Sequence, residues 1–341
     1  MTSDSGHPTA TSAAIRSSDG KEWVRVAAIL AVNLLLVLAA VLWACAGNVP
    51  PLTTQDKPAS ALEEGAFVPQ TLNLHAELLP VSAAMALILT FRRLDLALPA
   101  TMVLVAAMRG LLPVAGAPAM LAITFAIGAG LGLTNAACTY YGRVSSALWT
   151  GVLLLGLLGP WLNPFGDYPL GAWPRHVALA VSLGWLTAGA FLLGVLGLSG
   201  CPSNPPDLPA GKRGWAGLAC AWVVAEVGAG LAVQSATCYP AGGLLEYPLI
   251  LSSAAMSGAF ILRGRMGALT AVALACVAHL CCALARSFGD VASHAGHPGY
   301  GLLTAAWPLM AVVLYVAIDR LIRRYGNEEE NWSKEIGVGI R

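Results

Sequence analysis

Charged residues are scarce in this chain, and hydrophobic residues are abundant. Asp, Glu, Lys and Arg together supply 11% of the residues, whereas hydrophobic types supply 57%. The mean hydropathy is correspondingly high, at +0.69. This balance excludes a soluble globular protein, because too much apolar surface would face water. The 19 basic and 18 acidic residues nearly cancel, which gives no electrostatic support for nucleic-acid binding.

Sequence motifs for hydrolysis and metal binding are also missing. The chain has no Walker A pattern, no HExxH and no GxSxG segment. Its eight cysteines form no CxxC pair, and most of them lie inside apolar segments, where a thiol packs as a small hydrophobe. We therefore expect no enzyme activity, no metal site and no cofactor. The chain by itself is not expected to hydrolyse ATP.

Long apolar segments are the dominant feature that is present. Val24–Ala46, Pro118–Tyr140 and His176–Gly200 all exceed the roughly 18 residues that a helix needs to cross a bilayer. The first is too long for the core of a signal peptide and is interpreted as a retained helix. We predict an all-α polytopic protein of the plasma (inner) membrane. Its ten transmembrane helices are expected at 24–46, 72–90, 95–112, 118–140, 146–160, 176–199, 214–234, 246–262, 266–286 and 301–319.

The distribution of basic residues supports this layout. If the N-terminus is cytoplasmic and the helices alternate, 15 of the 19 Lys and Arg residues fall on the cytoplasmic side. The four on the other side are Lys57, Arg109, Arg175 and Arg286. Such a bias follows the positive-inside rule, and an error of one helix would destroy it. Both termini are therefore predicted to be cytoplasmic.

The chain is predicted to be one membrane domain with two polar tails. Residues 1–20 are rich in Ser, Thr and Gly and are expected to form a disordered cytoplasmic tail. Residues 21–325 form the transmembrane domain, and residues 326–341 form a charged cytoplasmic tail. Four prolines in the loop 201–213 offer a division into six and four helices. A division near 161–175 would instead give two five-helix halves of opposite orientation.

Two acidic residues fall inside or beside apolar segments, where a charge needs a partner or a cavity. Asp95 stands close to Pro99, and together they favour a broken helix. For Asp95 we favour an ion pair with Arg92 or Arg93 at the inner interface. Glu226 lies near the middle of its helix and is the best single candidate for a functional intramembrane residue. A structural hydrogen bond is its equal alternative.

Asn135 follows a glycine-rich run in the fourth predicted helix. Gly128 and Gly132 form a small-xxx-small face, which lets two helices approach closely, and we favour helix packing as their role. The Asn135 amide can donate and accept hydrogen bonds between helices.

Several short segments, in a fixed order, carry a family resemblance. RRLDLALP (Arg92–Pro99), LTNA (Leu133–Ala136) and RVSSALWT (Arg143–Thr150) are followed by Glu246, an apolar helix and Arg263-Gly264-Arg265. This order resembles the permease subunits of bacterial ribose/sugar-type ABC importers, whose motifs are GGIDLSVG, a Leu-Asn-Gly helix end and RVPPFIxT. The match covers roughly residues 70–325. Two departures are Arg92-Arg93 in place of Gly-Gly and Ser145-Ser146 in place of the paired prolines.

The resemblance implies a divergent permease subunit that moves a small, sugar-like solute across the inner membrane. It implies a separate ATP-binding subunit, a solute-binding protein and a homodimer or heterodimer within the bilayer. Asp95, Asn135 and Glu226 would line the substrate pathway. In the family, an inner-loop helix docks on the ATPase, whereas here the prolines of Ser199–Trp215 disfavour a helix. The cytoplasmic residues nearest an ATPase would be Arg143, Lys212, Arg213, Arg263 and Arg265.

Two other functions stay open. An ion-coupled secondary transporter with inverted repeats would use Glu226 as its titrating group. A non-transporting scaffold or sensor on a decayed permease fold would account for the changed docking loop and the lost Gly-Gly pair. An integral membrane enzyme is the least favoured class, because no nucleophile, metal set or paired carboxylates stand at workable spacing.

Overall fold

The computed structural model describes a part of the chain that is mostly helical. It covers residues 23–39, 42, 76–113, 116–157, 169–198, 212–238, 246–259, 267–294, 310–311, 313–321 and 324. No strand occurs among these residues, and the predicted all-α class is confirmed. The predictions for both tails, for the proline-rich loop 199–211 and for Arg263 and Arg265 lie outside the described residues.

The helices follow the predicted segments closely. After the helix Trp23–Ala39 come η1 (Ala76–Leu78), α4 (Leu79–Thr90), α5 (Leu98–Leu111), α6 (Ala117–Tyr140), α7 (Ser146–Leu157), α8 (Arg175–Val195), α9 (Lys212–Ala232), α11 (Tyr247–Met256) and α12 (Gly267–His294). A last helix includes residues 313–321. Within α6, α8, α9 and α12, four stretches are long and apolar enough to cross a membrane: Ala117–Tyr140, Arg175–Val195, Gly214–Ala232 and Gly267–Arg286. The number of spans and the orientation of the termini stay predictions.

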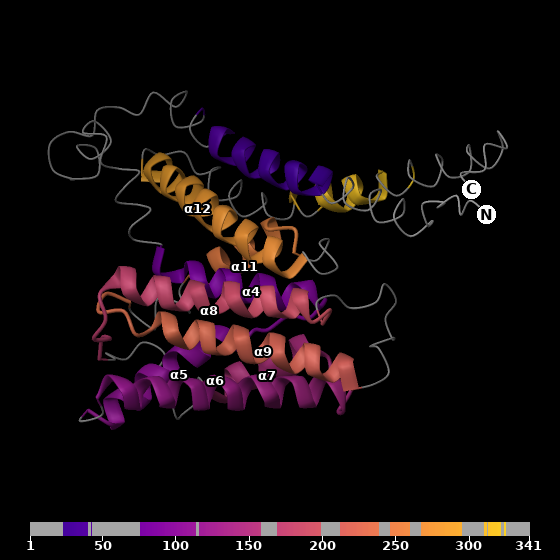
Figure 1. The fold of residues 1–341 in the computed structure, drawn as a ribbon. Coiled ribbons are helices and arrows are strands. Elements are labelled where there is room, and N and C mark those ends of the chain that lie inside the picture. The colour runs from indigo at the N-terminus through magenta and orange to yellow at the C-terminus, as the bar shows by residue number, and fades with distance from the viewer. Residues whose placement is uncertain are drawn as a thin grey trace, which may run out of the picture.

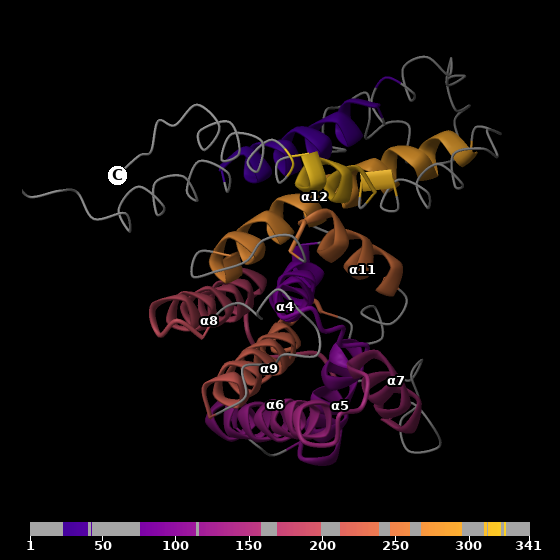
Figure 2. The same cartoon turned by 90° about the vertical axis from the view of Figure 1, so that its right-hand side faces the viewer.

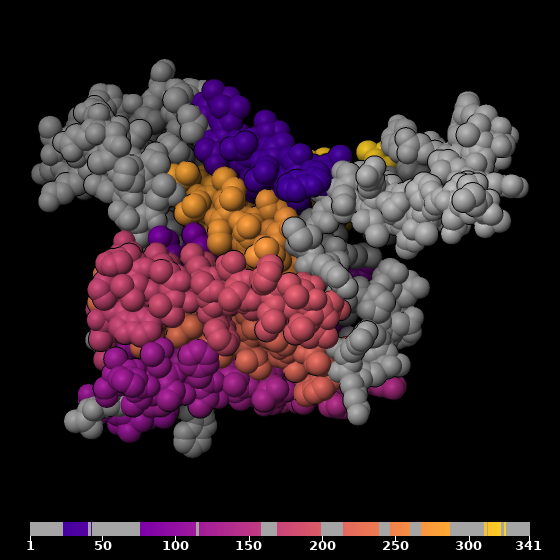
Figure 3. Space-filling view, in the orientation of Figure 1, coloured from indigo at the N-terminus to yellow at the C-terminus, as the bar shows by residue number. Residues whose placement is uncertain are grey.

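Helix α4 occupies the centre of the molecule. Figure 2 shows it surrounded by α8, α9, α11 and α12. Eleven of its twelve residues are buried, and only Leu89 is partly exposed. By contrast, α8 lies at the molecular surface (Figure 3). Its large apolar side chains Phe191 and Val195 are exposed. The molecule therefore has a buried central helix and an apolar exterior, as expected where lipid replaces water.

The chain breaks between α4 and α5, where the sequence predicts a broken helix. Residues 91–97 are non-helical, and Pro99 lies in the first turn of α5. Proline is tolerated there because the N–H that it lacks has no intrahelical partner. The break therefore precedes the proline.

Helices α6 and α9 pack closely and run in opposite directions (Figure 1). A Cβ atom added to Gly132 would lie 2.7 Å from the backbone nitrogen of Val223, and one added to Gly128 would lie 2.7 Å from that of Val227. The expected packing role of both glycines is confirmed.

Replacing Gly132 by alanine should separate α6 from α9, because the added methyl group meets backbone that cannot rotate away. We expect the free energy of unfolding to fall by about 2 kcal/mol, a typical cost of overpacking. Thermal unfolding in detergent measures it. The matched control is G130A, since a Cβ atom at Gly130 meets nothing within 4 Å. Equal losses in the two variants would contradict this packing role.

Arg92 has a left-handed backbone conformation, with φ 55°. The sugar-importer permeases that the sequence resembles have a glycine at this position. This conformation costs a non-glycine residue about 1–2 kcal/mol. A glycine at the same position avoids this cost but loses more conformational entropy on folding, which offsets part of the gain. We therefore expect R92G to raise the free energy of unfolding by up to about 1 kcal/mol. Thermal unfolding of R92G beside R93G, whose backbone is not left-handed, tests this expectation.

Candidate functional site

The break between α4 and α5 places Asp95 inside the helix bundle. Its side chain is fully buried. Oδ1 accepts a hydrogen bond at 2.9 Å from the backbone N–H of Ala97, two residues further along the chain, and Oδ2 accepts one from the indole Nε1 of Trp222 at 2.6 Å. The expected ion pair with Arg92 or Arg93 is wrong, because none of the ion pairs between described residues includes Asp95.

Glu226 is the second fully buried carboxyl group, and it projects from α9. Its Oε2 accepts a hydrogen bond from the hydroxyl of Thr101 on α5 at 2.5 Å. Its Oε1 accepts one from Nδ2 of Asn135 on α6 at 2.9 Å. Glu226 thus joins α9 to two neighbouring helices.

Asn135 connects the two carboxyl groups. Its Nδ2 also lies 3.3 Å from Oδ2 of Asp95, and its Oδ1 accepts a hydrogen bond from Nε1 of Trp149 on α7 at 3.0 Å. The three residues predicted to line a pathway therefore meet, although they come from three separate segments. We call the group of Asp95, Asn135, Glu226, Thr101, Trp149 and Trp222 the carboxylate cluster.

The electrostatics of the cluster require a proton or another cation. Asp95 and Glu226 share the NH₂ group of Asn135 as a hydrogen-bond donor. Within the described part of the chain neither forms an ion pair. Two like charges about 4 Å apart repel by about 4 kcal/mol even at an effective dielectric constant of 20, and both would also lose hydration. We therefore expect that one of the two carboxyl groups is protonated in the closed bundle.

The sequence does not identify Thr101, Trp149 and Trp222 as members of the cluster, and it does not show that the two carboxyl groups lie together. Asp95 and Glu226 are 131 positions apart, so no local spacing links them. One signal was available for Trp222, because it precedes Glu226 by one helical turn and hence shares its face of α9. Thr101 and Trp149 offered no such signal.

The residues predicted to face an ATPase lie apart from the cluster. Arg143 is exposed in the turn between α6 and α7 and has φ 52°. The end of α6 lies near the beginning of α9, where the ring of Tyr141 packs at a tilt against that of Trp215 with ring centroids 5.0 Å apart. Lys212 and Arg213 begin α9, but their side chains lie outside the described part. Arg143 and the start of α9 thus share one end of the bundle, while a docking role stays a prediction.

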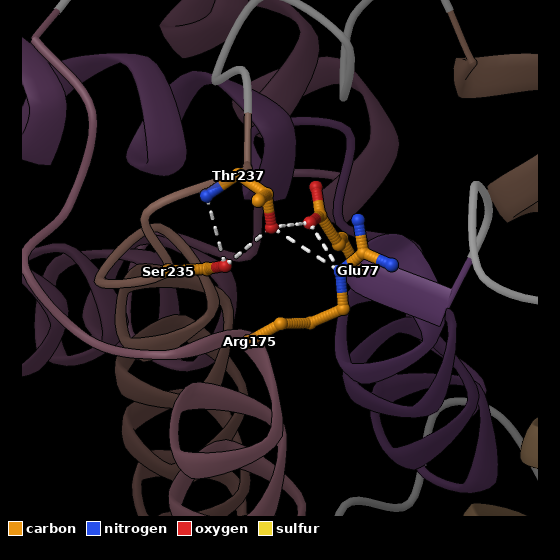
Figure 4. A network of polar contacts seen from close by, with 4 residues as sticks. All are labelled: Glu77, Arg175, Ser235 and Thr237. Atoms are coloured by element: carbon orange, nitrogen blue, oxygen red, sulfur yellow. Dashed lines mark hydrogen bonds and ion pairs between the residues drawn. The ribbon is translucent and has the colours of Figure 1, made fainter.

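A second polar network lies at the start of α4 (Figure 4). Glu77 accepts a hydrogen bond from the hydroxyl of Thr237 and pairs with Arg175, whose Nε lies 2.9 Å from Oε1 of Glu77. Ser235 contacts Thr237 at 3.0 Å. Burial beside this network raises the pKa of the Cys238 thiol to about 12. The network ties η1, the start of α8 and the segment after α9 together.

Comparisons with protein-family models, with curated proteins and with solved structures give no match for this chain. The function is therefore inferred from the geometry of the cluster and from its chemistry.

Replacing Glu226 by glutamine should be tolerated, because its amide oxygen can accept from Asn135 while its NH₂ group donates to the hydroxyl of Thr101, which in turn donates to the carbonyl oxygen of Ala97. We expect E226Q to remain within about 1 kcal/mol of the wild type, whereas E226A should lose about 3 kcal/mol by leaving buried polar groups without partners. Thermal unfolding in detergent measures both variants. A loss in E226Q as large as that in E226A would contradict a neutral Glu226.

Proposed function

We propose that this chain is a membrane permease in which the carboxylate cluster forms the polar centre of a solute pathway. One observation carries the proposal: the first three segments that resemble sugar-importer permeases come together in space. Asn135, from the second segment, donates to Asp95, from the first. Ser146 and Thr150, from the third segment, bind the backbone on either side of Asp95.

The cost of the cluster supports a functional role. Buried carboxyl groups in an apolar bundle are expensive even when they are hydrogen-bonded. An aliphatic core of similar volume would hold the helices together without that cost. Polar groups inside membrane helices mark pathways of ions and solutes more often than lipid-facing structure.

The energy for transport would come from a separate ATP-binding subunit. The chain has no Walker A pattern of its own. The end of the bundle with Arg143 and the start of α9 is the proposed docking face, together with Arg263 and Arg265. A dimer within the bilayer, a solute-binding protein on the opposite side and a sugar-like solute complete the proposal by resemblance to the importer family.

Co-purification from the native membrane tests the partner. We expect the tagged chain, after mild cross-linking, to recover a P-loop ATPase, and R143E to reduce that recovery at least severalfold by reversing a charge at the docking face. The matched control is R175E, which reverses a charge in the network of Glu77. Recovery of no ATPase by the wild type would overturn the ATP-driven form of the proposal.

The Asp95–Glu226 pair favours a second candidate function, a proton-coupled transporter. Two buried carboxyl groups that hold one proton form a site that can load and release it as the bundle opens to either side. Such a transporter needs no ATPase.

Proton movement separates the two candidates. Proteoliposomes that contain the purified chain and the internal pH dye pyranine are given a pH gradient. A proton-coupled carrier should dissipate the gradient, and E226Q should abolish this flux because glutamine cannot release a proton. E246Q is the control, since Glu246 pairs with Arg286 rather than with the cluster. Equal flux in the wild type, E226Q and empty liposomes would exclude proton coupling through Glu226.

A further inference from the structure

Helix α7 has an unusual division of its side chains for a short apolar helix. Leu148, Val152 and Leu155 are exposed, at 64%, 56% and 73% of their surfaces. The polar residues Ser146 and Thr150 are buried, and Trp149 is partly buried. Because residues three and four apart share a helix face, these three side chains project together toward the bundle. We call Ser146, Trp149 and Thr150 the bracket face.

The bracket face holds the chain on both sides of Asp95. The hydroxyl of Ser146 accepts a hydrogen bond from the backbone N–H of Leu94 at 3.1 Å, and that of Thr150 accepts one from the N–H of Leu96 at 2.9 Å. The break between α4 and α5 exposes backbone donors that no helix satisfies, and α7 satisfies two of them. The position of the Asp95 backbone is thereby fixed relative to α7.

Trp149 fixes the other half of the cluster. An indole N–H can only donate, so the atom of Asn135 that faces it must be the amide oxygen. The NH₂ group of Asn135 is then turned toward Asp95 and Glu226, which is the orientation that joins them. A flipped amide would present its oxygen to the carboxyl groups and lose both hydrogen bonds.

We propose that α7 is the positioning helix of the carboxylate cluster, and that Trp149 is a positioning residue that sets the orientation of the Asn135 amide. Helix α7 begins directly after the turn that holds Arg143. The consequence for transport rests on the function proposed above. A displacement of this turn would be transmitted to Asp95 and Asn135 through the bracket face, without any contact between α7 and the solute.

Carbodiimide labelling of Glu226 tests the positioning role on the isolated protein. This reagent modifies protonated carboxyl groups in apolar surroundings, and peptide mass spectrometry gives the rate at Glu226. In W149F an aromatic ring remains but the N–H is lost, so the Asn135 amide is free to turn and Glu226 loses one of its two donors, while Thr101 still donates to it. We expect labelling about tenfold faster than in the wild type, as for the loss of one hydrogen bond that holds the buried carboxyl group in the closed cluster.

The matched control is W185F. Trp185 is also partly buried, and its Nε1 donates at the same 3.0 Å, but to the carbonyl oxygen of Val224 on α9. Loss of the Trp185 N–H should change the labelling rate at Glu226 less than twofold. Equal rates in W149F and W185F, including no labelling in either, would overturn the proposal. Thermal unfolding of both variants shows whether a difference in labelling exceeds a general loss of stability.

A second pair of variants keeps the test valid if W149F fails to fold. T150V removes the hydroxyl that holds Leu96 at nearly constant volume, and T150S keeps it. We expect T150V to accelerate labelling of Glu226 severalfold and T150S to behave as the wild type. Identical rates in these two variants would remove α7 as the positioning helix. Because no solute and no ATPase is used, failure to recover an ATPase would leave this result unaffected.

Discussion

The burial of two carboxyl groups against a single amide is the constraint on which the centre of this molecule depends. Asp95 and Glu226 are fully buried, and no ion pair with a described residue neutralises either. Hydrogen bonds from several helices must therefore offset the free-energy cost of removing the two carboxyl groups from water. This requirement accounts for the contribution of α5, α6, α7 and α9 to one small cluster. It also restricts the relative movement of these helices, because a shift of about 1 Å would break bonds of this length.

Close approach of α6 and α9 is a precondition for the cluster. Asn135 reaches Glu226 because Gly128 and Gly132 let the two backbones come together. Larger residues would move α6 outward and lengthen the distance between the amide and the carboxyl group. The glycines and the carboxylate cluster are thus two parts of one arrangement, in which small residues set the spacing and polar residues use it.

Three of the four exceptions to the positive-inside distribution have a structural reason, and the fourth, Lys57, lies outside the described residues. Arg109 donates to Gln234 and to backbone carbonyl oxygens, Arg175 pairs with Glu77, and Arg286 pairs with Glu246. These three predicted outer cations are thus held by specific partners. A basic residue fixed in this way is part of the tertiary structure. It is therefore a weaker indicator of how the chain is oriented in the membrane than a free cation in a loop.

The sequence by itself determined the helical segments, because apolar length and composition are local properties of the chain. It also singled out Asp95, Asn135 and Glu226, since a polar residue in an apolar segment is visible without a structure. The partners of those residues were decided only by tertiary structure. The expected Asp95–arginine pair was local and wrong, because the bundle offers Asp95 the buried donors Trp222 and Asn135. The role of Trp149 was equally hidden, since the direction of a hydrogen bond depends on how distant helices pack and not on their spacing along the chain.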